Sequence, residues 1–92
     1  MLLYENKFKE DYVVYRTTSI KPNGKFGNWL FDNMMQRNWT CGDVARILHS
    51  TRQNIRNHVI GRSKPQYVWV VAYCSIFNHN PDEIWKIVLE EF

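Results

Sequence analysis

Cysteine is scarce in this chain, with only Cys41 and Cys74 among its 92 residues. The two lie in different predicted elements, and neither has a second Cys or a His nearby at the spacing of a zinc site. We therefore expect two buried or half-buried thiols in a reducing compartment, in preference to a disulfide or a metal site.

Long apolar runs are also missing. No stretch approaches the about 18 consecutive apolar residues of a membrane-spanning helix, and no charged-then-apolar leader with a cleavage site is recognisable. We expect a cytoplasmic protein with no membrane partner.

The chain lacks a catalytic constellation. Its histidines, His49, His58 and His79, are scattered, and each is interpreted as a turn, helix-face or cap residue. The acids gather near the C-terminal end without a second carboxylate in a plausible cleft. Glycine is sparse, and Gly61-Arg62-Ser63 follows a predicted helix, whereas a phosphate-cradling loop opens one. We expect no enzymatic activity, no cofactor and no small-molecule ligand.

The chain is rich in apolar and aromatic residues, and its charged residues are unevenly distributed along the sequence. Apolar residues make up 45% and aromatic residues 15%, which predicts one small folded domain. The net charge is only +3, but five basic residues and one acid lie between Thr40 and Gln66, whereas 82–92 holds one lysine and four acids. Positive charge concentrated on one segment is the electrostatic footprint of phosphate binding.

A short helix is predicted from Thr40 to Leu48. Thr40 and Asp43 come close to a capping box, because a hydroxyl and a carboxylate can satisfy the free amides of the first turn. Apolar residues then recur at helical spacing, at Val44, Ala45, Ile47 and Leu48. His49 and Ser50 break this pattern, so the helix is about two turns long.

A second helix is predicted for residues 51–60, with Thr51 as N-cap and Gly61 in the left-handed conformation at its end. Ile55 and Val59 can fix one face to the preceding helix. Amides and guanidiniums, and no acid, project from the rest: Arg52, Gln53, Arg56 and Asn57. These groups suit base edges, because Arg pairs with guanine and Asn or Gln with adenine. The alternative is an ordinary solvated amphipathic helix.

Three runs, Thr40–Leu48, Thr51–Ile55 and Gly61–Pro65, together resemble the lambda-repressor-like helix-turn-helix family, also called Cro-type or XRE-type. The resemblance extends through Phe77 and Asn78 to Ile84 and covers residues 26–85. It implies sequence-specific binding of double-stranded DNA by a transcription regulator of the phage or mobile-element repressor type. Residues 51–60 would then read the major groove.

The resemblance also implies a role for individual residues. The base-reading candidates lie on the second helix of the motif: Arg52, Gln53, Asn54 and Asn57. His58 is a secondary candidate for DNA contact. The phosphate-binding candidates begin each helix or follow the second one: Thr40, Cys41, Thr51, Arg56, Arg62, Ser63 and Lys64. Relatives often carry Gln at the position of Cys41. Because Cys cannot replace the Gln side chain, only backbone amides remain here for the phosphate contact.

The rest of the chain completes a mainly α fold of five helices with a short N-terminal β-rich extension. Residues 1–25 are rich in aromatic and β-branched residues and suit a hairpin or extended strands, ending in a turn at 21–25. We expect the helix-turn-helix domain to span 26–92, with its first helix from about Phe26 to Arg37.

The segment Tyr67–Phe77 has strand-like composition but helical spacing, because Tyr67, Val70, Cys74 and Phe77 recur on one face. We follow the spacing and predict a helix. Asn78 then takes the left-handed position, and Asn80 with Pro81 starts a last helix that buries Ile84, Ile87 and Val88 and ends near Glu90.

Many relatives have an Arg at the position of Met34 and a Glu at that of Val59, which form an ion pair. Both positions are apolar here, a replacement that avoids desolvating two charges and predicts contact between Met34 and Val59.

We expect a homodimer, joined through the N-terminal extension or the C-terminal helix, with Trp69 and Trp85 as candidates for the seam. The alternative function is a protein-interaction module, antitoxin-like or host-factor-binding, that keeps the fold without specific DNA binding. The aromatic content and modest charge favour that alternative.

Overall fold

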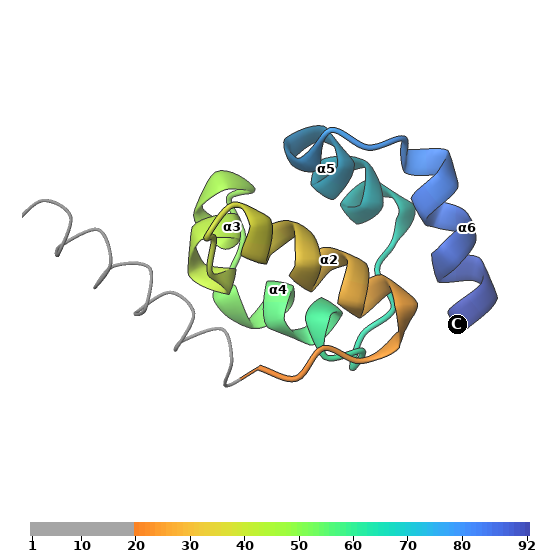
Figure 1. Cartoon of the computed structure of the whole chain (residues 1–92), viewed down its shortest axis with the longest axis horizontal. Coiled ribbons are helices and arrows are strands. Elements are labelled where there is room, and N and C mark those ends of the chain that lie inside the picture. The colour runs from red at the N-terminus through yellow and green to blue at the C-terminus, as the bar shows by residue number, and fades with distance from the viewer. Residues whose placement is uncertain (1–19) are drawn as a thin grey trace, which may run out of the picture.

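A computed structural model describes residues 20–92, and within that range the chain forms five α-helices and no strand. The helices are α2 (Gly24–Gln36), α3 (Cys41–Ile47), α4 (Arg52–Val59), α5 (Tyr67–Phe77) and α6 (Pro81–Glu91) (Figure 1). The mainly α fold is therefore confirmed. The β-rich prediction for the N-terminal extension falls on residues 1–19, outside the described part of the chain.

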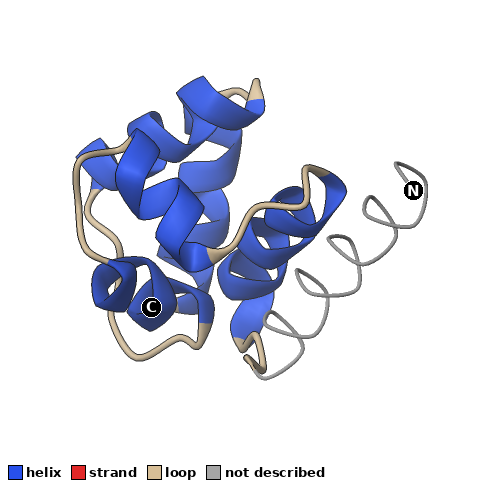
Figure 2. Ribbon diagram, turned by 90° about the vertical axis from the view of Figure 1, so that its left-hand side faces the viewer, coloured by secondary structure: helices blue, strands red, loops and turns tan. Residues whose placement is uncertain are grey.

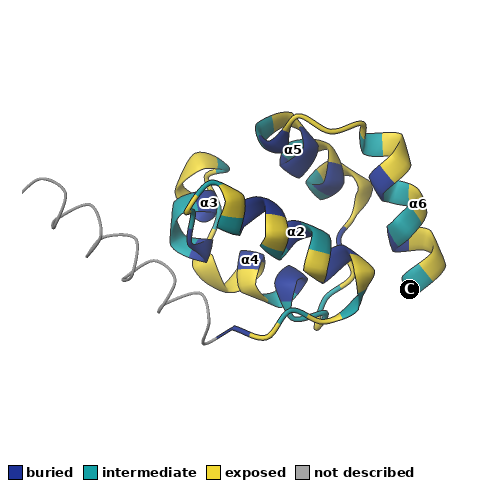
Figure 3. Cartoon of the chain, viewed as in Figure 1, coloured by how far each residue is buried: buried dark blue, intermediate teal, exposed yellow. Residues whose placement is uncertain are grey.

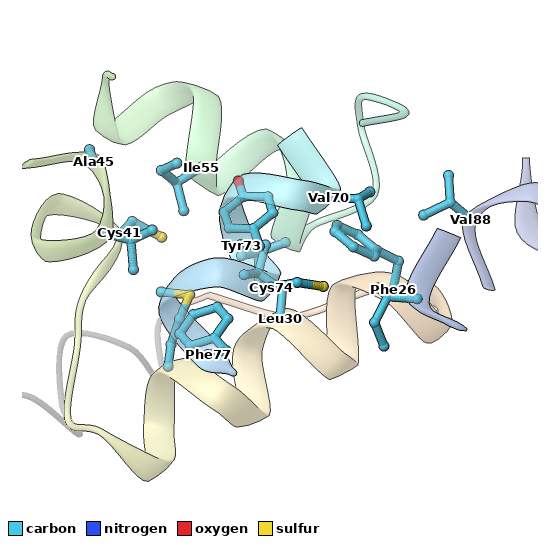
Figure 4. Close-up of a cluster of buried hydrophobic side chains, with 14 of the residues drawn as sticks. Phe26, Leu30, Cys41, Ala45, Ile55, Val70, Tyr73, Cys74, Phe77 and Val88 are labelled. Carbon is cyan, nitrogen blue, oxygen red and sulfur yellow. The ribbon is translucent and has the colours of Figure 1, made fainter. Parts of the chain in front are cut away.

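The helices are arranged around α2. It contacts α4 on one side and α6 near its start, while α3 packs on α4 and α5 on α6 (Figures 1 and 2). Buried residues line the inner side of each helix and exposed residues the outer side (Figure 3). Phe26, Ile55, Tyr73 and Val88, from four different helices, lie in one core cluster (Figure 4).

Helix α2 begins two residues earlier than the sequence predicts. Phe26, Leu30 and Met34 recur at helical spacing and are buried, as expected. The expected turn at 21–25 is wrong in its second half, because Gly24 and Lys25 already belong to the helix. The reason is tertiary: the Glu91 carboxylate at the end of α6 accepts a hydrogen bond from the backbone N–H of Lys25.

Helices α2 and α4 approach closely. Gly27 of α2 lies against the carbonyl of Val59 on α4, leaving no room for a β-carbon. That carbonyl also accepts a hydrogen bond of 3.0 Å from the backbone N–H of Asn23. Met34 and Val59 are both fully buried in the core cluster. The two positions where relatives have an ion pair thus lie in an apolar interior.

Residues Tyr67–Phe77 form a helix, as their spacing predicts, but one of the four residues that recur on one face is exposed. Val70, Cys74 and Phe77 are buried, whereas Tyr67 is 43% exposed. Its hydroxyl donates a hydrogen bond of 2.9 Å to Asp82 of α6. Tyr73, which the pattern did not select, is fully buried instead.

The predicted C-cap of α5, Asn78, and the predicted N-cap of α6, Asn80, are both confirmed. Asn78 has a φ of 63°, in the left-handed region, and the Asn80 side chain accepts a hydrogen bond of 2.9 Å from the backbone N–H of Asp82. Pro81 occupies the first turn. Ile84 and Val88 are buried, but Ile87 is only half-buried.

None of the helices in residues 20–92 has the length and apolar character needed to cross a lipid bilayer. Both cysteines are free and buried, as expected. Burial raises the pKa of each thiol to about 11, so both are protonated at neutral pH.

Candidate nucleic-acid interface

The polar side chains of α4 lie on its outer surface. Ile55 and Val59 are fully buried, whereas Arg52, Gln53, Asn54 and Arg56 are exposed and Asn57 is half-buried. Thr51 caps the helix as expected, because its hydroxyl accepts a hydrogen bond of 3.2 Å from the backbone N–H of Asn54. Apolar contacts thus fix one side of α4 to the core and leave the other side open to solvent.

The amide side chains on this surface are held by short-range hydrogen bonds. Gln53 Nε2 donates to Asn57 Oδ1 at 2.9 Å, one turn further along the helix. Asn54 Nδ2 donates to Ser50 Oγ at 3.1 Å. The first bond leaves the carbonyl oxygen of Gln53 and the amino group of Asn57 available to a ligand.

Two arginines of α4 bring positive charge to the start of α3. Burial raises the pKa of the Cys41 thiol, and the guanidiniums of Arg56 and Arg52 partly offset this rise. These charges therefore act on the first turn of the neighbouring helix. Residues 51–64 contain no acid that could neutralise them.

The start of α3 has the predicted capping box. The backbone N–H of Asp43 donates to Thr40 Oγ1 at 3.1 Å, and the backbone N–H of Thr40 donates to Asp43 Oδ2 at 2.8 Å. Thr40 and Cys41 are both buried, so their side chains are withdrawn from a phosphate. Because the N–H groups of Thr40 and Asp43 are engaged in the capping box, only the peptide N–H groups of Cys41 and Gly42 remain as candidates for the phosphate contact.

The residues after α4 turn back over its end. The backbone N–H groups of Arg62 and Ser63 both donate to the carbonyl of Asn57, at 2.9 and 3.3 Å. Gly61 has a φ of 76°, the left-handed cap that the sequence predicts. Arg62 and Lys64 are exposed and Ser63 is half-buried. The ammonium of Lys64 lies 5.9 Å from the centre of the Trp85 ring.

His58 does not belong to this surface, so the expectation that it is a secondary DNA contact is wrong. Its side chain is buried, and Nδ1 lies 2.7 Å from the hydroxyl oxygen of Tyr73. Burial lowers the pKa of His58 to about 4. His58 follows Ile55 by three residues and precedes Val59. This spacing places it beside the apolar face of the helix and indicates burial.

The turn between α3 and α4 holds a strained residue that the sequence pattern did not reveal. His49 has a φ of 55°, a left-handed conformation that costs a side chain with a β-carbon about 1 kcal/mol. We expect His49→Gly to stabilise the protein by up to about 1 kcal/mol in urea unfolding, because the relief of the backbone exceeds the entropy that glycine adds to the unfolded chain. His49→Ala removes the same imidazole without relieving the backbone, so equal gains in both variants would contradict this explanation.

Within residues 20–92, no cluster of three or more His, Cys, Asp or Glu side chains is placed to hold a metal ion. Comparisons of the chain with protein-family models, with curated proteins and with solved structures found no match.

Proposed function

We propose that this chain is a sequence-specific double-stranded DNA-binding protein of the lambda-repressor-like helix-turn-helix type, acting as a phage or mobile-element repressor. Helix α3 and the turn after it position α4, which enters the major groove. One observation carries the proposal: α4 is anchored by Ile55 and Val59 and turns exposed arginines and amides, with no acid, to solvent.

Base reading belongs to the amino-terminal half of α4. Arg52 can pair with the two acceptors of guanine, and Gln53 can pair with the acceptor and donor of adenine. The hydrogen bond from Gln53 to Asn57 holds the amide in place before DNA arrives. Less side-chain freedom is then lost on binding.

Phosphate contacts flank this helix. Arg62 and Lys64 are exposed after its end, and the exposed Arg56 brings its charge to the start of α3. The peptide N–H groups at the start of α3 would hold a phosphate on the other side of the groove. Such contacts set the orientation of the protein on the duplex and supply most of the sequence-independent affinity.

A comparison of two arginines separates base reading from phosphate binding. Arg52→Ala should weaken binding to the specific site by about 1–3 kcal/mol and relax sequence preference. Arg62→Ala should weaken binding to all duplexes about equally and reduce the salt dependence. Arg62 is a better comparator than Lys64, because Lys64 also packs on Trp85.

Selection from a random duplex pool supplies the specific site, and fluorescence anisotropy on that site and on random duplex measures both variants. Equal losses on the two duplexes for Arg52→Ala would contradict its role in reading bases.

The second candidate function is a protein-interaction module, which the exposed apolar side chains of α5 and α6 favour. Titration of duplex DNA at several salt concentrations distinguishes the two. A DNA-binding protein loses affinity steeply as salt rises, whereas the interaction module would bind no duplex even at low salt.

A further inference from the structure

Asn23 precedes helix α2 and is followed by Gly24, and no other asparagine of the chain has a glycine after it. The side-chain amide of an asparagine is open to attack by the backbone nitrogen of the next residue. Glycine favours this attack, because no β-carbon crowds its nitrogen or restricts its backbone. Asn23 is exposed, and its side chain makes no cap hydrogen bond to α2. Its amide carbon is therefore accessible.

The reaction at such a pair is an intramolecular substitution followed by hydrolysis. The Gly24 nitrogen bonds to Asn23 Cγ and closes a five-membered imide. The proton of that nitrogen passes through solvent to the side-chain amino group, which leaves as ammonia. Water then breaks one of the two bonds between the imide nitrogen and its carbonyl carbons. The products are aspartate and isoaspartate, and in isoaspartate the main chain is longer by one methylene.

The folded backbone around Asn23 opposes this ring closure. Closure requires the Gly24 nitrogen to eclipse the β-carbon of Asn23, whereas the ψ of Asn23 is 134°, an extended conformation that turns the nitrogen away. The backbone is also held on both sides of the reacting bond. The N–H of Asn23 donates to the Val59 carbonyl at 3.0 Å, and the N–H of Lys25 donates to the Glu91 carboxylate. Rotation about ψ therefore has to break one of these hydrogen bonds.

The hydrogen bond to Glu91 is the one that opens more easily. Glu91 lies in the last turn of α6, beside the start of α2 (Figure 1), and helix ends open at low free-energy cost. Its carboxylate is also the group nearest to the position of a β-carbon on Gly24. A negative charge there opposes the loss of the Gly24 proton and the negative charge that develops on the attacked amide. Glu91 thus slows the reaction by restraint and by charge.

We propose that Asn23 is a site of spontaneous deamidation and that Glu91 controls its rate by holding the first turn of α2 closed. No DNA contact enters this reaction, so it is independent of the proposed function. Either product adds a carboxylate near that of Glu91, and the repulsion weakens the contact between α6 and α2. The reaction is irreversible, so the weakened form accumulates as the protein ages.

Ageing of the full chain at mildly alkaline pH tests the proposal. Peptide mass spectrometry measures the conversion of Asn23 to the acid, and enzymatic methylation detects isoaspartate. The folded wild type should convert more slowly than the chain unfolded in urea. Glu91→Ala should accelerate conversion in the folded protein about fivefold, the factor expected for the loss of one hydrogen bond.

Two variants serve as matched controls. Tyr67→Phe removes the hydrogen bond to Asp82 at the opposite end of α6, and Glu90→Ala removes the neighbouring exposed carboxylate. Both should convert at the wild-type rate, and circular dichroism should show that all variants are folded. Equal acceleration by Tyr67→Phe would mean that overall unfolding limits the rate, which would overturn the role of Glu91. Absence of conversion at Asn23 in folded Glu91→Ala, while the unfolded chain converts, would overturn the site itself.

Discussion

Replacing Gly27 by alanine should destabilise the protein by about 2 kcal/mol. The new β-carbon would lie inside the contact distance of the Val59 carbonyl oxygen, a backbone atom that cannot rotate away. Overpacking of this kind typically costs about 1–3 kcal/mol. Alanine favours a helix over glycine by about 1 kcal/mol. The expected loss of stability is therefore the cost of the steric clash minus this gain.

Gly42→Ala is the matched control for this substitution. Gly42 also lies in a helix, but its added β-carbon would meet only the Thr40 hydroxyl oxygen, at 3.6 Å, an ordinary contact. It should be neutral or stabilising by up to about 1 kcal/mol. Urea unfolding of both variants measures the difference, and equal stability would show that α2 and α4 do not approach as closely as described.

The free energy of unfolding should fall by about 2–3 kcal/mol between pH 6.5 and pH 4 because of His58 alone. Burial lowers the pKa of His58 from 6.5 to about 4 in the folded protein. Below pH 6.5 the unfolded chain binds a proton that the folded chain does not, so acid favours unfolding. Above about pH 7.5 the imidazole is neutral in both states, and its contribution no longer depends on pH.

His58→Gln provides the comparison, because glutamine can form a hydrogen bond but does not titrate in this range. Carboxylates contribute the same pH dependence to both proteins, so the difference between the two curves isolates His58. Urea unfolding at pH 7, 6, 5 and 4 should show the wild type losing stability more steeply. Parallel curves would mean that His58 is not enclosed by Tyr73 and Trp69.

The candidate surface on α4 was predictable to a useful degree. The cap at Thr51 and the apolar pair Ile55 and Val59 determine which side of the helix turns inward, and the exposed side follows from them. Spacing places His58 beside the apolar stripe, but the sequence around it carries no sign of the hydrogen-bond partner that makes burial of a histidine favourable. Tyr73 lies fifteen residues away in sequence.

The sequence by itself determined where most helices begin and end. Thr40, Thr51 and Asn80 satisfy amides within three residues of themselves, and Gly61 supplies a left-handed conformation, so these signals need no distant partner.

Only the tertiary structure decided which side chains are enclosed where helices meet. The Glu91 carboxylate accepts a hydrogen bond from the first turn of α2, and Asp82 accepts one from the exposed Tyr67 hydroxyl. These contacts join residues far apart in the chain. Local periodicity and propensity contain no information about such pairs, because the pairs exist only after the helices have packed.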